Sequence, residues 1–208
     1  MEDVLAVYAR PYDARYPVIC ADESNKVLHA ETRAPQGPQP GQPGRVDDSY
    51  EPAGTVNLFL FTEPLRGWRR VAVTERRTGL DFAAQLRQLV EEDYPAAERI
   101  VLVVDNLNTH HPGVLYEAFP AEQARQIAER LEWHYTPKHG SWLNMAEIEL
   151  SALAQQCLDR RFPDRDTLQN EAAAWEAVRN AEEVVIDWRF TTEDARIKLK
   201  HLYPSIHS

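Results

Sequence analysis

Two short apolar segments of this 208-residue chain each end in an aspartate. Residues 17–22 read PVICAD and residues 100–105 read IVLVVD, and both patterns are typical of buried strands. Sites in α/β sheets form beyond the carboxyl ends of the strands. If these strands are parallel neighbours, Asp22 and Asp105 lie side by side. The alternative is that each aspartate is only a turn or cap residue after its strand.

Strand and helix patterns alternate along the rest of the sequence. Two strands at 55–62 and 69–74 are joined by the turn EPLRGW and predict a hairpin. Further patterns predict helices at 81–93, 121–131, 141–161 and 164–181, a strand at 132–136, and a C-terminal helix capped by Thr191 or Thr192. This order predicts one α/β domain over residues 1–208, with a mixed central sheet flanked by helices.

Residues 33–54 differ in composition from the rest of the chain. They hold five of the 14 prolines and four of the eight glycines, which predicts a long loop without a core of its own. Loops of this length inside a compact domain are usually functional or disordered.

A third acid stands out when residues 143–158 are placed on a helix at about 100° per residue. Glu147 then falls within the apolar stripe, whereas Glu149 falls on the opposite, solvated side. A carboxylate on a buried face is costly unless it is paired or bound to a metal. Alternatively, Glu147 lies at the margin of the stripe and reaches water. Ser141 is placed to cap the start of this helix.

Three converging carboxylates would repel one another, and a divalent metal relieves that repulsion. Oxygen ligands suit Mg²⁺ or Mn²⁺ rather than zinc. Two such ions activate a water and stabilise the leaving oxygen in a phosphoryl displacement. We therefore predict that Asp22, Asp105 and Glu147 are both the metal ligands and the catalytic residues.

Composition excludes several other classes of protein. The chain has no Cys-x-x-Cys pair for zinc or redox chemistry, and Cys20 and Cys157 are expected to be reduced and buried. The longest aliphatic run, residues 100–104, is far too short for a membrane span, and no targeting segment is visible, so we expect a cytoplasmic protein. The net charge of −10 taken alone argues against nucleic-acid binding.

The segments around the three acids resemble the signatures of a known family. CADES at Asp22, VVDNLNTHHP at Asp105 and YTPKHGSWLNMAEIE at Glu147 are similar to the catalytic signatures of DDE transposases of the mariner superfamily, bacterial insertion-sequence type. The third family signature reads Leu-Asn-x-x-Glu, and LNMAE at residues 143–147 fits it. The likeness runs from about residue 8 to residue 205 and includes AGTVNLFLF, EPLRGWR and FTTEDARIKLKHLYP.

The resemblance implies an RNase H-like fold and a Mg²⁺-dependent enzyme in which Mn²⁺ can substitute. It implies nicking of transposon ends and transfer of the 3′-OH into target DNA, usually at TA. The implied partners are transposon-end and target DNA and a second copy of the chain, with the loop at about 33–54 reaching that copy or the DNA. The implied setting is the bacterial cytoplasm, in association with the nucleoid when the enzyme is active.

One departure from the family concerns the N-terminus. Family members carry a helix-turn-helix region that reads the transposon ends, but only 21 residues precede Asp22 here. We expect that region to be absent from this chain and encoded elsewhere, as in a split or frameshifted gene, unless the chain is a trimmed or decayed copy. Sequence-specific binding would then reside elsewhere, which reduces the conflict with the acidic charge.

Other residues are weaker candidates for DNA contacts. Arg69 and Arg70 lie in a basic hairpin that either follows phosphates or is a solvated edge strand. Trp142 either stacks on a base or packs under the sheet. Lys138 and His139 are further candidates to contact DNA, and His110 and Asn144 are expected near the site without being ligands.

Two other functions stay open. The first is a structure-selective nuclease of the RNase H-like group, which would cleave DNA without joining it. The second is a non-catalytic remnant, or a subunit of a split transposase that depends on a separately encoded partner.

Overall fold

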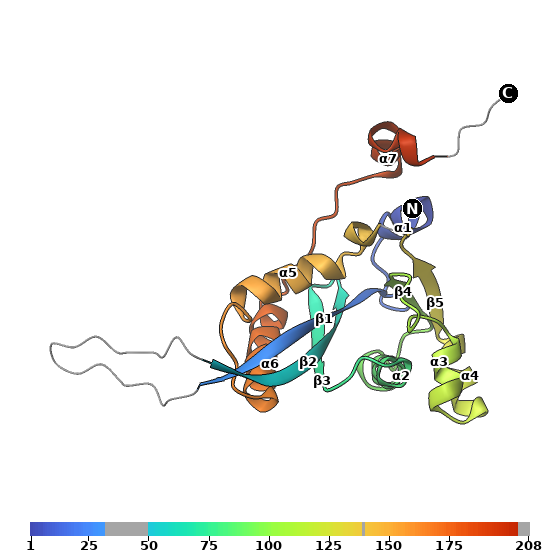
Figure 1. The fold of residues 1–208 in the computed structure, drawn as a ribbon. Helices are drawn as coiled ribbons and strands as arrows, with labels where there is room; N and C mark the ends of the chain where they lie inside the picture. The colour runs from blue at the N-terminus through green and yellow to red at the C-terminus, as the bar shows by residue number, and fades with distance from the viewer. Residues whose placement is uncertain (32–49, 139, 204–208) are drawn as a thin grey trace.

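The computed structural model describes residues 1–31, 50–138 and 140–203 (Figure 1). Within them the strands are β1 (Val18–Glu31), β2 (Tyr50–Glu63), β3 (Trp68–Thr74), β4 (Ile100–Val104) and β5 (Leu131–Tyr135). The helices are α1 (Glu2–Tyr8), α2 (Gly79–Gln88), α3 (Gly113–Ala118), α4 (Ala121–Glu129), α5 (Ala146–Gln156), α6 (Arg165–Ala181) and α7 (Thr192–Lys198). Short π-helical or 3-10 segments are η1 (Leu89–Asp93), η2 (Ser141–Leu143) and η3 (Lys200–Leu202).

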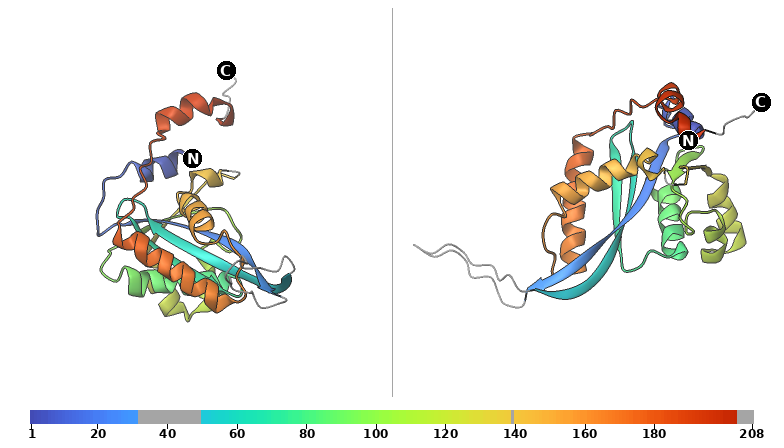
Figure 2. Two further views of the ribbon diagram at one scale, coloured as in Figure 1. Left: turned by 90° about the vertical axis from the view of Figure 1, so that its left-hand side faces the viewer. Right: turned by 45° about the horizontal axis from the view of Figure 1, so that its top comes forward.

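The strands form one mixed sheet in the order β3-β2-β1-β4-β5. β1 pairs antiparallel with β2 and parallel with β4, and β4 pairs parallel with β5. Helices α5 and α6 lie on one side of this sheet, and α2, α3 and α4 lie on the other (Figure 2). The predicted mixed sheet flanked by helices is confirmed. The short helices α1 and α3 are not among the elements that the sequence predicted.

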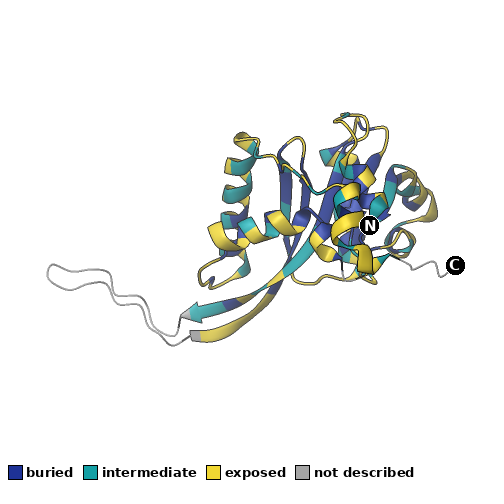
Figure 3. Cartoon of the chain, turned by 90° about the horizontal axis from the view of Figure 1, so that it is seen from above, coloured by how far each residue is buried: buried dark blue, intermediate teal, exposed yellow. Residues whose placement is uncertain are grey.

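The first two strands are much longer than the apolar runs that predicted them. β1 and β2 each span 14 residues, whereas the apolar runs cover only 17–22 and 55–62. Beyond Cys20, β1 pairs with β2 alone, and the far end of this hairpin projects beyond the helices with exposed residues (Figure 3). Its polar sequence shows no apolar run, so only the cross-strand ladder reveals it. Most of the predicted loop at 33–54 lies outside the described residues, but residues 50–54 belong to β2.

Side chains of β1 alternate between two cores. Cys20 packs with the residues under α5 and α6, whereas Ile19 and Ala21 pack with those under α2, α3 and α4. By the same alternation Asp22 faces the α5 side and Glu23 faces the α2 side. The predicted buried, free thiols at Cys20 and Cys157 are confirmed.

Side chains of helix α6 form hydrogen bonds with the backbone of the edge strand β3. The Asn180 side chain accepts a hydrogen bond from the Arg69 backbone N–H and donates one to the Arg69 carbonyl, both at 2.8 Å. The Glu176 carboxylate accepts from the Val71 N–H at 2.7 Å. Unpaired backbone groups on an edge strand invite pairing with other chains. Here they are satisfied by side chains of α6.

Local capping signals explain where two helices begin. Thr78 with Asp81, and Thr191 with Asp194, form reciprocal capping boxes at the starts of α2 and α7. The predicted cap at Thr191 is therefore confirmed. No helix within the described residues is both long enough and apolar enough to cross a membrane.

Candidate active site

The parallel pairing of β1 with β4 places two of the predicted acids. The last residue pair of this ladder is Cys20 opposite Val103. Two residues further along the sequence from each member of that pair are Asp22 and Asp105. Asp105 directly follows β4, as predicted. Asp22 does not end its strand, because β1 continues to Glu31 by pairing with β2. The predicted parallel pairing of the two strands is confirmed, and Asp22 and Asp105 occupy equivalent positions beyond its last residue pair.

Burial and repulsion act together on Asp22. Burial raises its pKa to about 7, and the negative charges of Asp105 and Glu147 contribute to the rise. The three acids therefore act on one another electrostatically, although they come from two strands and one helix. A divalent cation suits such a set of oxygen donors with excess negative charge. Among the described residues, no three acids, histidines or cysteines are already grouped tightly enough to form a metal site.

Asn144 connects the glutamate-bearing helix to the strand that carries Asp22. It is fully buried, and its side-chain amide donates a hydrogen bond to the Ala21 carbonyl at 2.8 Å. Its side-chain oxygen accepts from the Ala146 N–H at 3.1 Å, at the start of α5. The prediction that Ser141 caps this helix is wrong, because Ser141 begins the separate 3-10 segment η2. The N-cap position of α5 is Met145, which makes no side-chain capping bond, and Asn144, one residue earlier, supplies the acceptor for the first backbone N–H of the helix.

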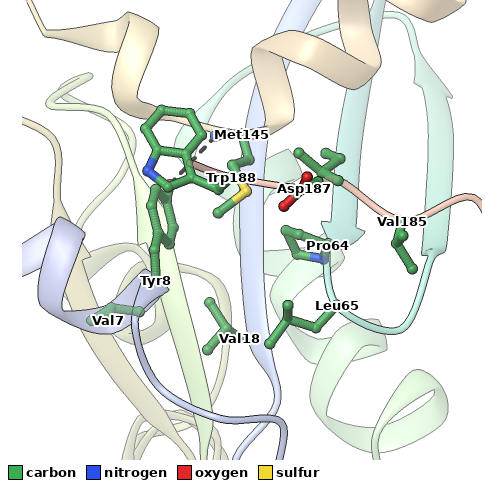
Figure 4. A pocket seen from close by; sticks show the side chains of 10 residues that line it. Val7, Tyr8, Val18, Pro64, Leu65, Met145, Val185, Asp187 and Trp188 are labelled. Atoms are coloured by element: carbon green, nitrogen blue, oxygen red, sulfur yellow. Dashed lines mark hydrogen bonds between the residues drawn. The ribbon is translucent and has the colours of Figure 1, made fainter. Parts of the chain in front are cut away.

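Tyr8 supports the same segment from the other side. Its hydroxyl donates to the Leu143 carbonyl at 2.7 Å, and its ring contacts Trp188 edge-on. Tyr8, Trp188 and Met145 border an apolar cavity of about 320 Å³ (Figure 4). None of the three predicted acids lines this cavity. The cavity lies between α1, the residue before α5 and the segment around Trp188, and it is not part of the candidate active site.

The helical-wheel interpretation of α5 is wrong about which glutamate is buried. Glu149 is 1% exposed, whereas Glu147 is exposed in the first turn of the helix. The wheel failed because α5 begins at Ala146, so Leu143 belongs to another segment. Ala154, which helped to define the predicted stripe, is exposed.

Two arginines explain why Glu149 is buried. The Arg69 Nε lies 3.3 Å from one Glu149 carboxylate oxygen, and Arg179 binds both oxygens at 2.9 and 3.2 Å. Arg69 comes from β3 and Arg179 from α6, so the ion pairs join three elements. A buried carboxylate is tolerated when it is paired in this way. Glu147 is left at the end of α5 that Asn144 ties to β1.

His110 lies directly against Asp105. Its Nδ1 is 2.6 Å from Asp105 Oδ1, and its Nε2 is 3.2 Å from the Glu23 carboxylate. Burial alone would lower the pKa of His110, but the hydrogen bond to Asp105 and the negative charges of Asp105 and Glu23 outweigh it and raise the pKa to about 9. Burial pushes the pKa of Asp105 upward, but hydrogen bonds from His110 and the Leu107 N–H outweigh it and lower that pKa. Asp105 is therefore held ionised.

Glu23 is a site residue that the sequence analysis missed. The only available signal was strand alternation, which places it on the opposite face of β1 from Asp22. Nothing local indicated that it would meet a histidine 87 positions away.

Arg69 and Arg70 are not surface residues, so the prediction that they contact DNA is wrong. Arg69 is fully buried with Glu149 and donates to the Val184 carbonyl at 2.5 Å. Arg70 is 8% exposed and donates to the Asp93 carboxylate at 2.7 Å. The edge-strand alternative is also wrong about solvation. The Arg69 guanidinium has partners in α5 and in the segment after α6, and the Arg70 guanidinium has partners in α2 and η1.

Lys138 and Trp142 lie in the connection between β5 and α5, and both are exposed. Trp142 is 44% exposed and contacts Phe190 edge-on, so it does not pack under the sheet. Lys138, Trp142 and Tyr203 border a cavity of about 470 Å³. His139 lies outside the described residues.

Comparison with protein families identifies the chain. Residues 17–169 match the model of the DDE superfamily endonucleases. The chain belongs to this family. The match includes Asp22, Asp105 and Glu147. No curated protein matches the sequence.

Solved structures similar to this DDE endonuclease chain agree on the fold. The Mos1 mariner paired-end complex with Mn aligns with a TM-score of 0.54 at 16% identity, covering 87% of this chain and 55% of that chain. The Mos1 strand transfer complex aligns at 0.53 and 17% identity with the same coverage. The chain thus spans about half the length of the Mos1 proteins. The predicted RNase H-like fold is confirmed.

Proposed function

We propose that this chain is the catalytic domain of a cut-and-paste DNA transposase. It would cleave DNA strands at transposon ends and transfer the 3′-OH to target DNA. The observation that carries the proposal is that Asp22 and Asp105 stand two residues beyond the end of the β1–β4 ladder and that Glu147, on a helix tied to the same strand, adds to the raised pKa of Asp22. Family membership and the Mos1-like fold support it.

Asp22, Asp105 and Glu147 would hold two divalent ions, Mg²⁺ or in its place Mn²⁺. When bound, these ions supply an activated nucleophile and neutralise charge on the leaving oxygen. The chain's own contribution is to keep Asp105 ionised through His110 and to fix Glu147 through Asn144. Burial and the nearby carboxylates of Asp105 and Glu147 disfavour the charged form of Asp22, and a bound cation would offset both effects.

The reaction needs no covalent link between protein and DNA. Water is the nucleophile for cleavage, and the freed DNA 3′-OH is the nucleophile for joining. In this proposal the β1–β4 pair and the start of α5, tied through Asn144, would keep the three acids in fixed relative positions. Positioning of this kind supplies a large share of the barrier reduction in such displacements.

Lys138 and Trp142 are the DNA-contact candidates that remain on the surface. They lie between the end of β5 and the start of α5, and we propose that DNA passes along this edge. His139 remains a further candidate. The proposed partners are transposon-end and target DNA and a second copy of the chain. A cytoplasmic, bacterial setting with a TA target belongs to the same proposal.

The decisive experiment compares the wild-type protein with Asp105→Asn on labelled transposon-end duplexes in Mg²⁺ and Mn²⁺. We expect D105N to abolish cleavage while its circular dichroism spectrum shows an intact fold. Asp159→Asn, which alters an exposed aspartate after α5, is the matched control and should cleave normally. Mn²⁺-dependent nicking retained by D105N would overturn the proposed site.

Two further outcomes separate the alternatives. Products joined to target DNA identify a transposase, whereas cleavage without joining identifies a structure-selective nuclease. Iron-generated hydroxyl radicals should cut the protein backbone near residues 22, 105 and 147, with excess Mg²⁺ suppressing the cuts. Absence of both metal-dependent cuts and DNA cleavage identifies a non-catalytic remnant.

A further inference from the structure

We propose that Glu23 and His110 form a positioning pair that fixes the orientation of the Asp105 carboxylate. The inference rests on the proposed function, in which Asp105 is a metal ligand. Neither residue would touch the metal or DNA. Their role would be to hold one oxygen of Asp105 and leave the other free.

The contacts of Asp105 are unequal between its two oxygens. Oδ1 accepts a hydrogen bond from the Leu107 N–H at 3.1 Å and lies 2.6 Å from His110 Nδ1. Within the described structure, no hydrogen bond is assigned to Oδ2. Because Oδ1 is occupied twice, the rotation of the carboxylate is fixed and Oδ2 is the oxygen available to a metal ion.

The imidazole ring of His110 is itself held on several sides. Its Nε2 lies 3.2 Å from Glu23, and the Phe82 ring lies 4.4 Å from it, centroid to centroid. The His110 backbone N–H donates to the Leu107 carbonyl at 2.9 Å, which closes the loop that follows β4. The ring is 1% exposed. Its position is thus set by β1, α2 and its own loop.

The Glu23 side chain makes one ion pair within the described part of the chain, and that pair is with His110. Its side chain is only 2% exposed, and in the ranges that the structure describes neither carboxylate oxygen makes a hydrogen bond of good geometry, although Oε1 lies 3.2 Å from His110 Nε2. Among the described residues, His110 is the one cationic group placed against it. Burying a carboxylate is costly, and apolar residues would fill this position at lower cost. A carboxylate here is explained if it holds the ring that holds Asp105.

Such support is needed because Asp105 follows the last paired residue of β4. Its backbone therefore leaves the sheet ladder, and its side chain depends on other contacts for a fixed direction. Groups that orient a metal ligand typically change metal affinity by about 10- to 100-fold when they are removed.

The test is a Mn²⁺ titration of the full chain, followed by electron paramagnetic resonance, with urea unfolding measured in the absence of metal. We expect His110→Ala to weaken Mn²⁺ binding by about 10- to 100-fold. The matched control is His111→Ala, the same change at the exposed neighbouring position, which should bind Mn²⁺ normally.

Two substitutions at Glu23 separate positioning from stability. Glu23→Leu removes a buried carboxylate, so the metal-free protein should be at least as stable as the wild type, yet Mn²⁺ binding should weaken severalfold. Glu23→Gln keeps an acceptor for the imidazole and should restore Mn²⁺ affinity to near the wild-type value. A purely structural role would move stability and affinity in the same direction.

The outcomes distinguish this inference from the proposed function. Normal Mn²⁺ affinity in H110A and E23L, together with lost affinity in D105N, overturns the positioning pair and leaves the proposed site intact. Normal affinity in D105N, or no Mn²⁺ binding by the wild-type protein, overturns both. Weakened binding in H110A and E23L with recovery in E23Q supports the pair.

Discussion

The Asn144 side-chain amide donates a hydrogen bond to the carbonyl oxygen of Ala21 at a distance of 2.8 Å. Ala21 directly precedes Asp22, and Asn144 lies three positions before Glu147. One buried amide therefore joins the two chain segments that carry the first and third acids. Residue 144 of the Leu-Asn-x-x-Glu signature thus has a physical role in this chain.

Asn144→Ala is expected to reduce DNA cleavage far more than it reduces stability. The change leaves the buried Ala21 carbonyl without its donor, which should cost about 1–3 kcal/mol in urea unfolding. Misplacing Glu147 by about 1 Å should reduce cleavage by roughly 100-fold.

The matched control for this prediction is Asn180→Ala. Asn180 also ties a helix to a strand, but it holds the outer edge of β3, away from the acids. A similar loss of stability with near-normal cleavage by the folded protein is expected. Equal losses of cleavage in the two variants would show that Asn144 acts only through stability.

Glu147 and Glu149 should respond to substitution in opposite ways. Glu147→Gln changes an exposed side chain, so stability should stay within about 0.5 kcal/mol of wild type while Mg²⁺-dependent cleavage is lost. Glu149→Gln leaves Arg69 and Arg179 without their buried counter-charge and should cost about 3–5 kcal/mol. Urea unfolding and cleavage assays on both variants measure the contrast. Loss of cleavage in folded E149Q, with normal cleavage in E147Q, would reverse the assignment.

The contrast between these glutamates shows where sequence reasoning failed. A helical wheel assumes that apolar residues define the buried face, and it needs the correct first residue of the helix. In α5 the buried face includes the charged Glu149, because Arg69 of β3 and Arg179 of α6 form ion pairs with it. Partners so distant in sequence leave no periodic signal near Glu149.

The fold itself was more accessible to prediction. Apolar runs identified β1, β2 and β4, the alternating pattern of residues 69–74 identified β3, and Thr191 identified the start of α7. The far half of the β1–β2 hairpin was missed because its residues are polar and pair only with each other. The sequence also could not show that α6 packs on the edge strand that carries Arg69, because the contacting residues lie more than 100 positions apart.

Asp22 predicts a pH-dependent stability for the metal-free protein. Its pKa of about 7 lies above the ordinary value for aspartate, so the folded state binds this proton more tightly than the unfolded chain does. The resulting stabilisation is complete below the ordinary pKa and is lost as the pH rises through about 7. Asp22→Asn stays neutral, so it should unfold at a higher temperature than the wild type at pH 8.

The measurement is thermal unfolding in a chelator between pH 5 and pH 8.5. The advantage of D22N should grow with pH to a few degrees, since 1 kcal/mol corresponds to roughly 2–4 °C for a chain of this size. Asp105, Glu147 and His110 are the charged groups that act on Asp22 through space, so their charges contribute to the size of the effect. Added Mn²⁺ should stabilise the wild type but not D22N. A difference that is constant with pH would contradict the prediction.

Trp142 is expected to bind DNA through stacking. Trp142→Ala should weaken binding of a transposon-end duplex with a single-stranded overhang by roughly 5- to 100-fold, because stacking contributes about 1–3 kcal/mol per base. Trp142→Phe keeps an aromatic face and should retain most of the affinity. Fluorescence anisotropy at fixed salt measures both.

The control for this prediction is Tyr116→Ala, which removes an aromatic side chain with 52% exposure from α3 on the opposite layer. Its affinity should equal that of the wild type. A Trp142 variant that binds normally, or a Phe variant no better than the Ala variant, would show that the ring only packs against Phe190. The site of DNA entry would then have to be sought away from the β5–α5 connection.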